Sequence, residues 1–401
     1  MGFGQGLSGL AAAAQNLDVI GNNIANSGTI GFKAGSVAFA DVYATSRVGL
    51  GVQVAAINQR FAVGNISSGG QYDMAINGAN GFFRVVDSSG AVSYTRNGQF
   101  TIDQNLNLVT MGGANLTGYS AAGVGTAPVN LSLPQANIPP QATSGAGFVA
   151  NLNANAAIVD PATTPFDPLD PDTYTDTQPM TVYDSLGNAH QVTQYFAKRP
   201  ATGAGESAYE VFYMFDGQPM TPASATMTFD ATGRLTSAPN VAVAFATPGG
   251  TASPADPISV NLNYSGSTQF GSDFKTSATP DGYFSGEFST ISIAPDGTIL
   301  ASYTNGKTQG IGTIALANFN NVQGLQPVGD NAWVETSASG QAVLGQPGSN
   351  GLATIRGQAV EESNVNLSTE LVNMIVAQRT YQANTQTIKT QDQVLQSLLN
   401  I

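Results

Sequence analysis

The stretch FGQGLSGLAAAAQNLDVIGNNIAN, residues 3–26, decides the fold at the start of the chain. Its large apolar residues recur at spacings of three and four, which places them along one side of a helix. The same spacing returns near the end of the chain, over residues 367–399. We therefore predict two terminal helices, each with an apolar seam that packs against the other helix or against neighbouring copies of the chain. The seam residues are Phe3, Leu7, Leu10, Leu17 and Ile24 in the first helix, and Leu371, Met374, Tyr381, Ile388 and Leu395 in the second.

The composition excludes several classes of protein. Only 10% of the 401 residues are charged, against about 25% in an average soluble domain. Lys and Arg are few and not clustered, so we expect no nucleic-acid binding. The absence of Cys excludes disulfides and thiolate metal sites. No run of eighteen apolar residues predicts a membrane-spanning helix, and no basic residue precedes Lys33, so we expect no cleaved secretory signal.

Between the predicted helices the sequence is typical of β-structure. Short runs rich in Val, Ile, Thr, Tyr and Phe alternate with turns in which Gly or Asn tolerates a positive φ. This regular spacing predicts sandwich or barrel modules inserted between the two helices. Turns of this kind occur at Asp87–Gly90, Asn97–Gly98, Asp184–Gly187, Asp230–Gly233, Asp296–Gly297 and Asn305–Gly306.

The negative charge is concentrated in the middle of the chain. Residues 148–275 carry a net charge of −8, whereas residues 1–147 are neutral and residues 276–401 carry −5. This difference predicts a separate, well-solvated module over 148–275. Within it, residues 157–179 are rich in Pro and Asp and are predicted to form a long surface loop. Its carboxylates indicate either a solvated acidic loop, which we favour, or a weak calcium site built from Asp160, Asp167, Asp170, Asp172 and Asp176.

The sequence offers little for catalysis. His190 is the single histidine, which excludes a multi-histidine metal site, and its place after a turn indicates a surface or cross-strand role. The Gly pairs at 49–51 and 310–312 lack the spacing of a phosphate-binding loop. We expect no enzyme, cofactor or metal, and we predict a core position for the sole tryptophan, Trp333. A secreted β-rich adhesin and an unrecognised hydrolase remain as less favoured alternatives.

Specific motifs at both ends of the chain point to one family. In order along the chain, they resemble the signatures of the bacterial flagellar rod and hook proteins, and they cover roughly residues 1–120 and 280–401. The motifs are LDVIGNNIANSGTIGFK (17–33), YTRNGQF (94–100), GDNAW (329–333), ELVNMIVAQR (370–379) and YQAN (381–384).

Within that family the hook members are the closer match, because rod relatives carry a smaller insertion than 148–275. The resemblance implies an extracellular, curved and flexible tube of one subunit type, which couples the rod to the filament and transmits torque. It also implies export of the unfolded chain through the flagellar type III apparatus. The partners implied are the distal rod protein, the hook cap and the hook–filament junction protein. A distal rod subunit is the alternative, and the lack of Cys excludes crosslinking of neighbours through cysteine.

The resemblance and the pattern together predict nested layers. The terminal helices would pair as a coiled coil in an inner tube, and the insertion would lie at the outer surface. The predicted divisions are 1–27 with 366–401 for the paired helices, 28–70 with 350–365 for extended connections, 71–147 with 276–349 for a middle β-domain, and 148–275 for the acidic outer β-domain.

Two further sets of residues are expected to serve the tube. Beside the seams, we expect Asn22, Asn23, Asn26 and Phe32 to take part in the polymer interface. Residues 1–32 contain a single charge, Asp18, so an uncharged amide face would suit a channel through which unfolded chains slide. The candidates for that face are Gln15, Gln382, Gln386 and Gln393; the alternative is that they are ordinary polar helix positions.

Overall fold

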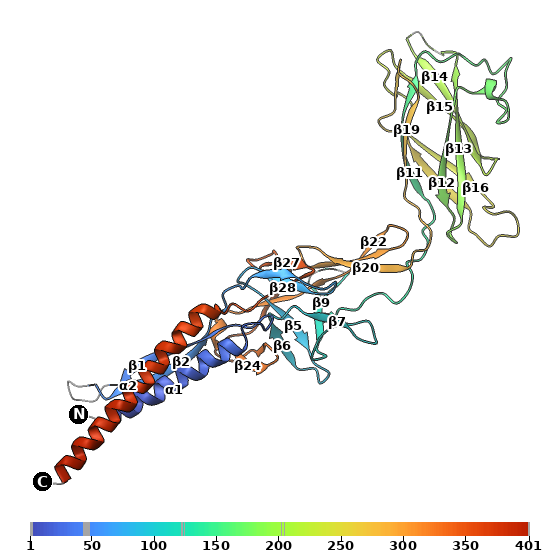
Figure 1. Ribbon diagram of the computed structural model, residues 1–401. Coiled ribbons are helices and arrows are strands. Elements are labelled where there is room, and N and C mark those ends of the chain that lie inside the picture. Colours follow the sequence, from blue (N-terminus) through green and yellow to red (C-terminus); the bar gives the residue numbers. More distant parts are fainter. Residues whose placement is uncertain are drawn as a thin grey trace. The chain divides into compact units, whose positions relative to one another are not determined.

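The chain is mainly β-structure with a helix at each end, as predicted (Figure 1). The computed structural model describes residues 3–42, 49–121, 123, 125–201, 203 and 205–399. Residues 398 and 399 are described by their backbone alone. The chain forms two compact units. Unit 1 consists of Met1–Gln135, Ser289–Ser302 and Thr308–Ile401, and unit 2 of Ala136–Phe288 and Tyr303–Lys307.

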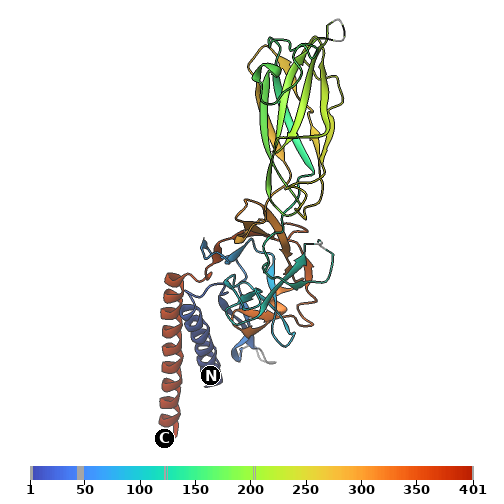
Figure 2. The same cartoon turned by 90° about the vertical axis from the view of Figure 1, so that its right-hand side faces the viewer.

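In unit 1 the two terminal helices lie side by side and run antiparallel (Figures 1 and 2). Helix α1 spans Phe3–Ala25 and helix α2 spans Leu367–Leu399. Asn366 caps the start of α2, because its side-chain oxygen accepts a hydrogen bond from the Thr369 amide at 3.1 Å. Helix α2 is ten residues longer than α1, and its C-terminal turns extend past the start of α1 (Figure 2).

A β-hairpin follows α1 and packs on it. Strand β1 (Gly35–Val42) pairs antiparallel with β2 (Gly51–Gln59), with a bulge between Ala38 and Phe39. The apolar alternation that begins at Val48 predicts a strand here; Val48 itself lies outside the described residues, and the strand begins at Gly51.

The rest of unit 1 is an antiparallel β-core that both arms of the chain build together. The outgoing strands β3 and β4 pair with the returning strands β28 and β27. Trp333 is buried in the core, in edge contact with Phe61 and Phe82, which confirms its predicted position. The strands that belong to this core are β3 (Ile66–Ser68), β4 (Met74–Asn77), β5 (Phe82–Val86), β6 (Val92–Thr95), β7 (Phe100–Ile102), β8 (Leu108–Thr110), β9 (Asn115–Ser120), β10 (Val129–Asn130), β20 (Phe288–Ile293), β21 (Thr298–Tyr303), β22 (Thr308–Ile314), β23 (Leu316–Asn318), β24 (Gln326–Gly329), β25 (Ala332–Val334), β26 (Val343–Gly345), β27 (Thr354–Gly357) and β28 (Ala359–Glu361).

Unit 2 is one sheet that curls around its own apolar core. Its strand order is β12-β13-β14-β15-β16-β17-β11-β18, and β19 pairs with β11. Phe148, Phe196, Tyr213 and Phe229 are fully buried inside the curl. The strands are β11 (Gly145–Asn153), β12 (Asp176–Tyr183), β13 (Ala189–Arg199), β14 (Ser207–Phe215), β15 (Gln218–Phe229), β16 (Asn240–Phe245), β17 (Ile258–Asn263), β18 (Thr268–Phe270) and β19 (Lys275–Pro280).

Apart from Asn97–Gly98, the predicted turns join strands that pair with each other. The strands on either side of Asn97–Gly98, β6 and β7, pair with other strands instead. At Asp87–Gly90 the carboxylate accepts the amide of Ser89 at 2.8 Å, and Gly90 takes a φ of 88°. The acidic loop, by contrast, is shorter than the predicted 157–179, because β12 begins at Asp176. Pro179 lies within this strand, which is possible because β12 is at the edge of the sheet.

Candidate functional site

Small residues of α1, packed against Ile388 and Asn384 of α2, bring the two helices together. A Cβ added at Gly6 would lie 3.0 Å from Cγ1 of Ile388, and one at Gly9 would lie 2.9 Å from the side-chain amide of Asn384. On the same helix, Ala12 and Ala13 are buried. A side chain at either position would have to displace Ile388 or Asn384, so Gly at positions 6 and 9 favours the close approach. Reasoning from large apolar residues missed this contact, although the Gly and Ala residues spaced along residues 6–13 carry its signal.

The seam residues lie beside this contact. Phe3, Leu7 and Leu371 expose 47%, 56% and 45% of their surface. A seam of heptad spacing drifts by about 20° per heptad around a straight α-helix, so it cannot follow one straight line of contact. Tyr381 and Leu395 are also exposed, Leu10, Leu17, Ile24 and Met374 are half-buried, and Ile388 faces Gly6.

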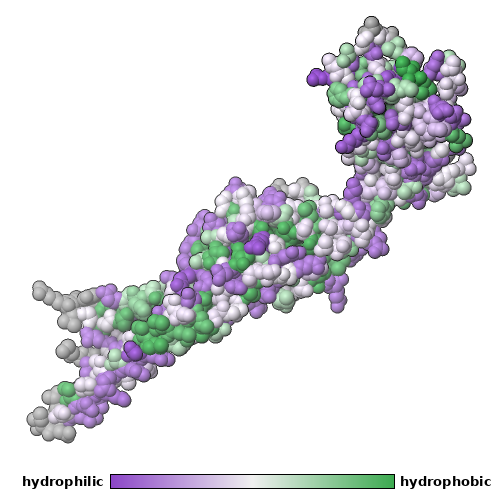
Figure 3. All heavy atoms as spheres, turned by 45° about the horizontal axis from the view of Figure 1, so that its top comes forward, coloured by the Kyte–Doolittle hydropathy of each residue, from purple (hydrophilic) through white to green (hydrophobic). Residues whose placement is uncertain are grey.

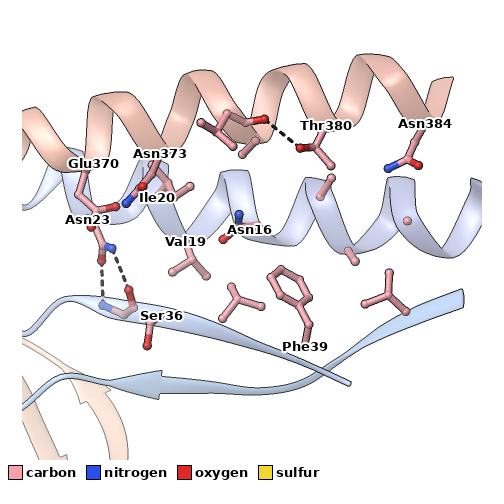
Figure 4. Close-up of a pocket in the computed structure, with 18 of the residues that line it drawn as sticks. Asn16, Val19, Ile20, Asn23, Ser36, Phe39, Glu370, Asn373, Thr380 and Asn384 are labelled. Carbon is pink, nitrogen blue, oxygen red and sulfur yellow. Dashed lines mark hydrogen bonds between the residues drawn. The ribbon is translucent and has the colours of Figure 1, made fainter. Parts of the chain in front are cut away.

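A groove opens on one side of the helix pair, between α1, α2 and the β1–β2 hairpin (Figure 4). Its volume is about 680 Å³. Apolar side chains such as Val19, Val37 and Phe39 line it together with the amides of Asn16 and Asn373. Its charged residues, Arg60 and Glu370, form an ion pair at 3.3 Å.

The predicted seams lie on the other side of the helix pair. None of the ten seam residues lines the groove, so helical periodicity places them away from the hairpin, next to the line where the helices touch. The two seams thus run side by side and form one surface, which we call the apolar strip. It consists of Phe3, Leu7, Leu10, Leu17, Ile24, Leu371, Met374, Tyr381 and Leu395, with Ile388 at its edge against Gly6. Figure 3 shows apolar residues gathered at the helix-bearing end of unit 1.

The asparagines named from the sequence hold the end of α1 in place, whereas the glutamines are exposed to solvent. Asn23 is buried and exchanges two hydrogen bonds with the backbone of Gly35, at 2.8 and 2.9 Å, which ties α1 to the hairpin (Figure 4). Asn26 bonds Asn22 within the last turn of α1, and Phe32 is half-buried just beyond it. The glutamines proposed for a channel are all exposed: Gln15, Gln382, Gln386 and Gln393.

The sequence motifs converge at a second place in unit 1, which we call the arm junction. The Asn331 side chain donates to the Ile30 carbonyl at 3.0 Å, and Thr95 donates to the Asn331 carbonyl at 2.8 Å. Gly31 has a φ of 72°, and a Cβ there would lie 2.6 Å from the Asn97 amide nitrogen. The motifs around residues 27–33, 94–100 and 329–333 are therefore parts of one packed unit.

A buried charge cluster holds the returning arm at this junction. The Glu361 carboxylate lies 2.5 Å from Nζ of Lys33 and 3.3 Å from Nη1 of Arg96, and all three side chains are fully buried. Glu361 also accepts the Gly64 amide at 2.9 Å. Lys33 donates in addition to the Ala62 carbonyl at 2.9 Å. Burial lowers the pKa of both Lys33 and Arg96, against the opposing attraction of Glu361.

Unit 2 contains a hydrogen-bond network around its single histidine. His190 lies with Nδ1 2.7 Å from Asp216 and Nε2 3.3 Å from Asp184. Burial raises the pKa of Asp184, but hydrogen bonds from Asn188 and His190 outweigh it and lower that pKa overall. His190 thus ties two hairpin turns together, a structural role beyond the surface or cross-strand position expected for it.

Carboxylates of the acidic loop accept hydrogen bonds within the loop's own turns. Asp160, Asp167 and Asp170 each accept a backbone amide two residues ahead, at 3.0, 2.9 and 3.0 Å. Phe166 stacks on Phe212 at 4.0 Å and fastens the loop to the sheet. Among the described residues, no group of His, Asp or Glu side chains is arranged to hold a metal ion.

Comparison with known proteins matches four separate parts of the chain to models of flagellar protein families. Residues 5–33 match the model described as Flagella basal body rod protein, and residues 75–146 match the Flagellar hook protein FlgE/F/G D1 domain. Residues 151–283 match the Flagellar basal body protein FlaE D2 domain, and residues 356–401 match the Flagellar basal body rod FlgEFG protein C-terminal model.

Relatives of full length are hook proteins. The chain is 45% identical over 415 residues to the flagellar hook protein FlgE of Escherichia coli, and 44% identical over 414 residues to that of Salmonella typhimurium, with complete coverage of each. It is 31% identical to the hook protein of Borreliella burgdorferi, covering 98% of it. The fold resembles the crystal structure of Helicobacter pylori FlgE2, with a TM-score of 0.56 and 16% identity over 73% of this chain and 99% of that one.

Neither helix that the structure describes is apolar over a stretch long enough to cross a membrane. Identity over the full length, together with the order of the four matched models, leaves one assignment: the chain belongs to the flagellar hook protein FlgE family.

Proposed function

We propose that this hook-family subunit builds a curved, flexible tube that couples the flagellar rod to the filament and transmits torque. The apolar strip is the observation that carries the proposal. Large apolar side chains along both terminal helices are left exposed in the single chain, and a patch of this kind marks a surface that another molecule covers. In a hook-family protein the covering molecule is another copy of the same chain.

The helix pair is suited to the inside of the tube. Apart from Asp18, residues 1–32 carry no charge, and the exposed glutamines of α2 present amides that cannot trap a passing chain by charge. Gln382, Gln386 and Gln393 are separated by four and seven residues, so they share one side of the helix. We assign this side to the central channel and the apolar strip to contacts between copies.

The acidic insertion is suited to the outside. Bending a tube requires outer contacts that exchange as a subunit passes from the inner to the outer side of the curve. Residues 148–275 carry a net charge of −8 and form a separate sheet with its own core. The middle β-domain, 71–147 with 276–349, and the connections 28–70 and 350–365 complete the proposed layers.

The partners belong to the same proposal. At its ends the tube meets the distal rod protein, the hook cap and the hook–filament junction protein, and the chain reaches the extracellular flagellum through the type III export apparatus. The role is mechanical, with no catalytic step.

Electron microscopy of the purified chain under polymerising conditions tests this function. Curved tubes of uniform diameter support a hook subunit. Straight, short tubes would instead favour the distal rod alternative. A chain that stays monomeric under every polymerising condition would contradict both and return the adhesin class to consideration.

A further inference from the structure

The helix pair has two unlike faces. One is the groove beneath the hairpin, and the other is the apolar strip, which shares no residue with the groove. We propose that the groove of one copy receives the apolar strip of the next copy. This inference rests on the proposed function, since it names the surface with which the strip pairs.

The groove has room and chemistry for apolar side chains. Its volume of about 680 Å³ lies in the range, ~300–1,000 Å³, of pockets that bury whole ligands. Small residues, including Gly9, Ala12 and Gly51, keep it open on the helix and hairpin sides. Phe39 lines the groove yet exposes 49% of its surface, so an apolar wall of the groove is left uncovered by the chain itself.

Charge does not oppose this contact. The groove contains one acidic and one basic residue, Glu370 and Arg60, and these already form an ion pair. The strip consists entirely of uncharged residues. Burying the strip in the groove therefore removes no unpaired charge from water, and so avoids a desolvation cost that many interfaces incur.

The position of the two faces favours polymer growth. The strip and the groove lie on different sides of the helix pair, so a copy that fills its neighbour's groove still presents its own groove to a third copy. Such a heterologous contact builds rings or open helical assemblies. Contact of strip with strip would instead be isologous and would close after two copies. A tube of one subunit type requires the first arrangement.

Single-cysteine variants test this pairing, because the natural chain has no Cys. One set carries Leu7→Cys, Leu17→Cys or Tyr381→Cys in the strip, and the other carries Ser36→Cys or Phe39→Cys in the groove. Strip and groove variants are mixed, polymerised and treated with a short bismaleimide. With one cysteine per chain, every crosslinked dimer reports a contact between two copies.

The proposal predicts dimers from strip–groove mixtures, several-fold more than from a control mixture of Ala383→Cys with Phe39→Cys. Ala383 is exposed and lies in neither surface. Dimers from strip variants alone, or equal yields from the test and control mixtures, would overturn it. Failure of the unmodified chain to form any polymer would instead overturn the proposed function itself.

Filling the groove provides a second measurement. Asn16→Leu places a larger apolar side chain in the groove at a helix position where Leu is favourable, so the monomer should fold. We expect its polymer yield to fall at least tenfold, whereas the Ala383→Leu control polymerises normally. Normal tubes from a folded Asn16→Leu protein would contradict the groove as the receiving surface.

Discussion

Three charged residues at the arm junction show how distant parts of the sequence depend on one another. Lys33, Arg96 and Glu361 are fully buried together, although Glu361 lies more than 250 residues from either partner. Taking charges out of water is costly, and one carboxylate between two cations limits that cost only while all three are in place. The cluster thus holds the returning arm, which leads into α2, against the outgoing arm.

Replacing Glu361 tests this dependence. Glu361→Gln leaves two buried cations without a counter-charge, so we expect a loss of ~3–5 kcal/mol in the free energy of unfolding. Urea unfolding followed by the fluorescence of Trp333, which is buried in the same unit, measures it. The neighbouring Glu362→Gln serves as a control, because Glu362 is only half-buried. Equal stability of the two variants would contradict a structural role for the cluster.

Lys33 adds a dependence on pH. Burial lowers its pKa below 10.5 in the folded chain, so in the alkaline range beneath 10.5 the unfolded chain binds more protons than the folded one. The contribution of Lys33 to stability therefore increases as pH rises toward 10.5. Lys33→Met, which leaves the Glu361–Arg96 pair intact, should be less destabilised than Glu361→Gln, and its deficit from the natural chain should widen with rising pH. A deficit that stays constant would contradict the shift.

The motifs at these residues identify the family from sequence, but their physical reason is visible only in the structure. Position 31 needs Gly because its φ is 72° and because the backbone of Asn97 leaves no room for a Cβ. No spacing in the sequence reveals that residues 27–33, 94–100 and 329–333 meet, because the contacts join segments more than 60 residues apart.

At the scale of elements, spacing alone predicted both terminal helices, and the two helices do contact each other. It did not predict which faces meet. Large apolar residues dominate a periodic pattern, whereas the intrachain contact is made where side chains are absent, at Gly6 and Gly9. The groove was equally beyond prediction, because it depends on how the hairpin packs against α1.

Glycine substitutions separate the role of close approach from that of helix propensity. Gly9→Leu introduces a side chain where a Cβ already meets Asn384 at 2.9 Å, whereas the Cβ of a residue at Gly21 would meet nothing within 4 Å. Both changes raise helix propensity by about 1 kcal/mol. We expect Gly9→Leu to lower the protection of amides in α2 against hydrogen exchange, and Gly21→Leu to leave it unchanged. Full protection in Gly9→Leu would show that close approach is not required.

At the scale of the whole molecule, the chain consists of two units with separate cores. The acidic bias of residues 148–275 predicts a separate module in the middle of the chain, and unit 2 of the structure spans Ala136–Phe288 with Tyr303–Lys307. The sequence could not give the curled sheet of that module, in which β11 pairs in parallel with β17 and β18, because parallel pairing joins strands that are distant in sequence.

Removing most of unit 2 tests whether unit 1 is sufficient for assembly while unit 2 sets the curvature of the tube. The Ser144 hydroxyl donates to the Asp281 carboxylate at 2.7 Å, so an Asn-Gly turn can replace residues 145–280 between two chain segments that already lie together. The retained segments still pair through the bridges Ile138–Gly286 and Gln141–Tyr283. We expect this variant to polymerise, because the strip and the groove are intact, but to form tubes of altered curvature in electron micrographs. Loss of all assembly would mean that the outer module is needed for polymerisation itself.

The central claim is that the exposed apolar strip joins copies of the chain, and Leu371→Asp tests it most directly. Leu371 is 45% exposed, so the monomer should keep its fold by circular dichroism, while contact between copies would bury an unpaired charge at a cost of several kcal/mol. We predict that electron microscopy under polymerising conditions shows tubes from the natural chain and from an Ala383→Asp control, and none from Leu371→Asp. Tubes of normal length and number from Leu371→Asp would contradict the claim.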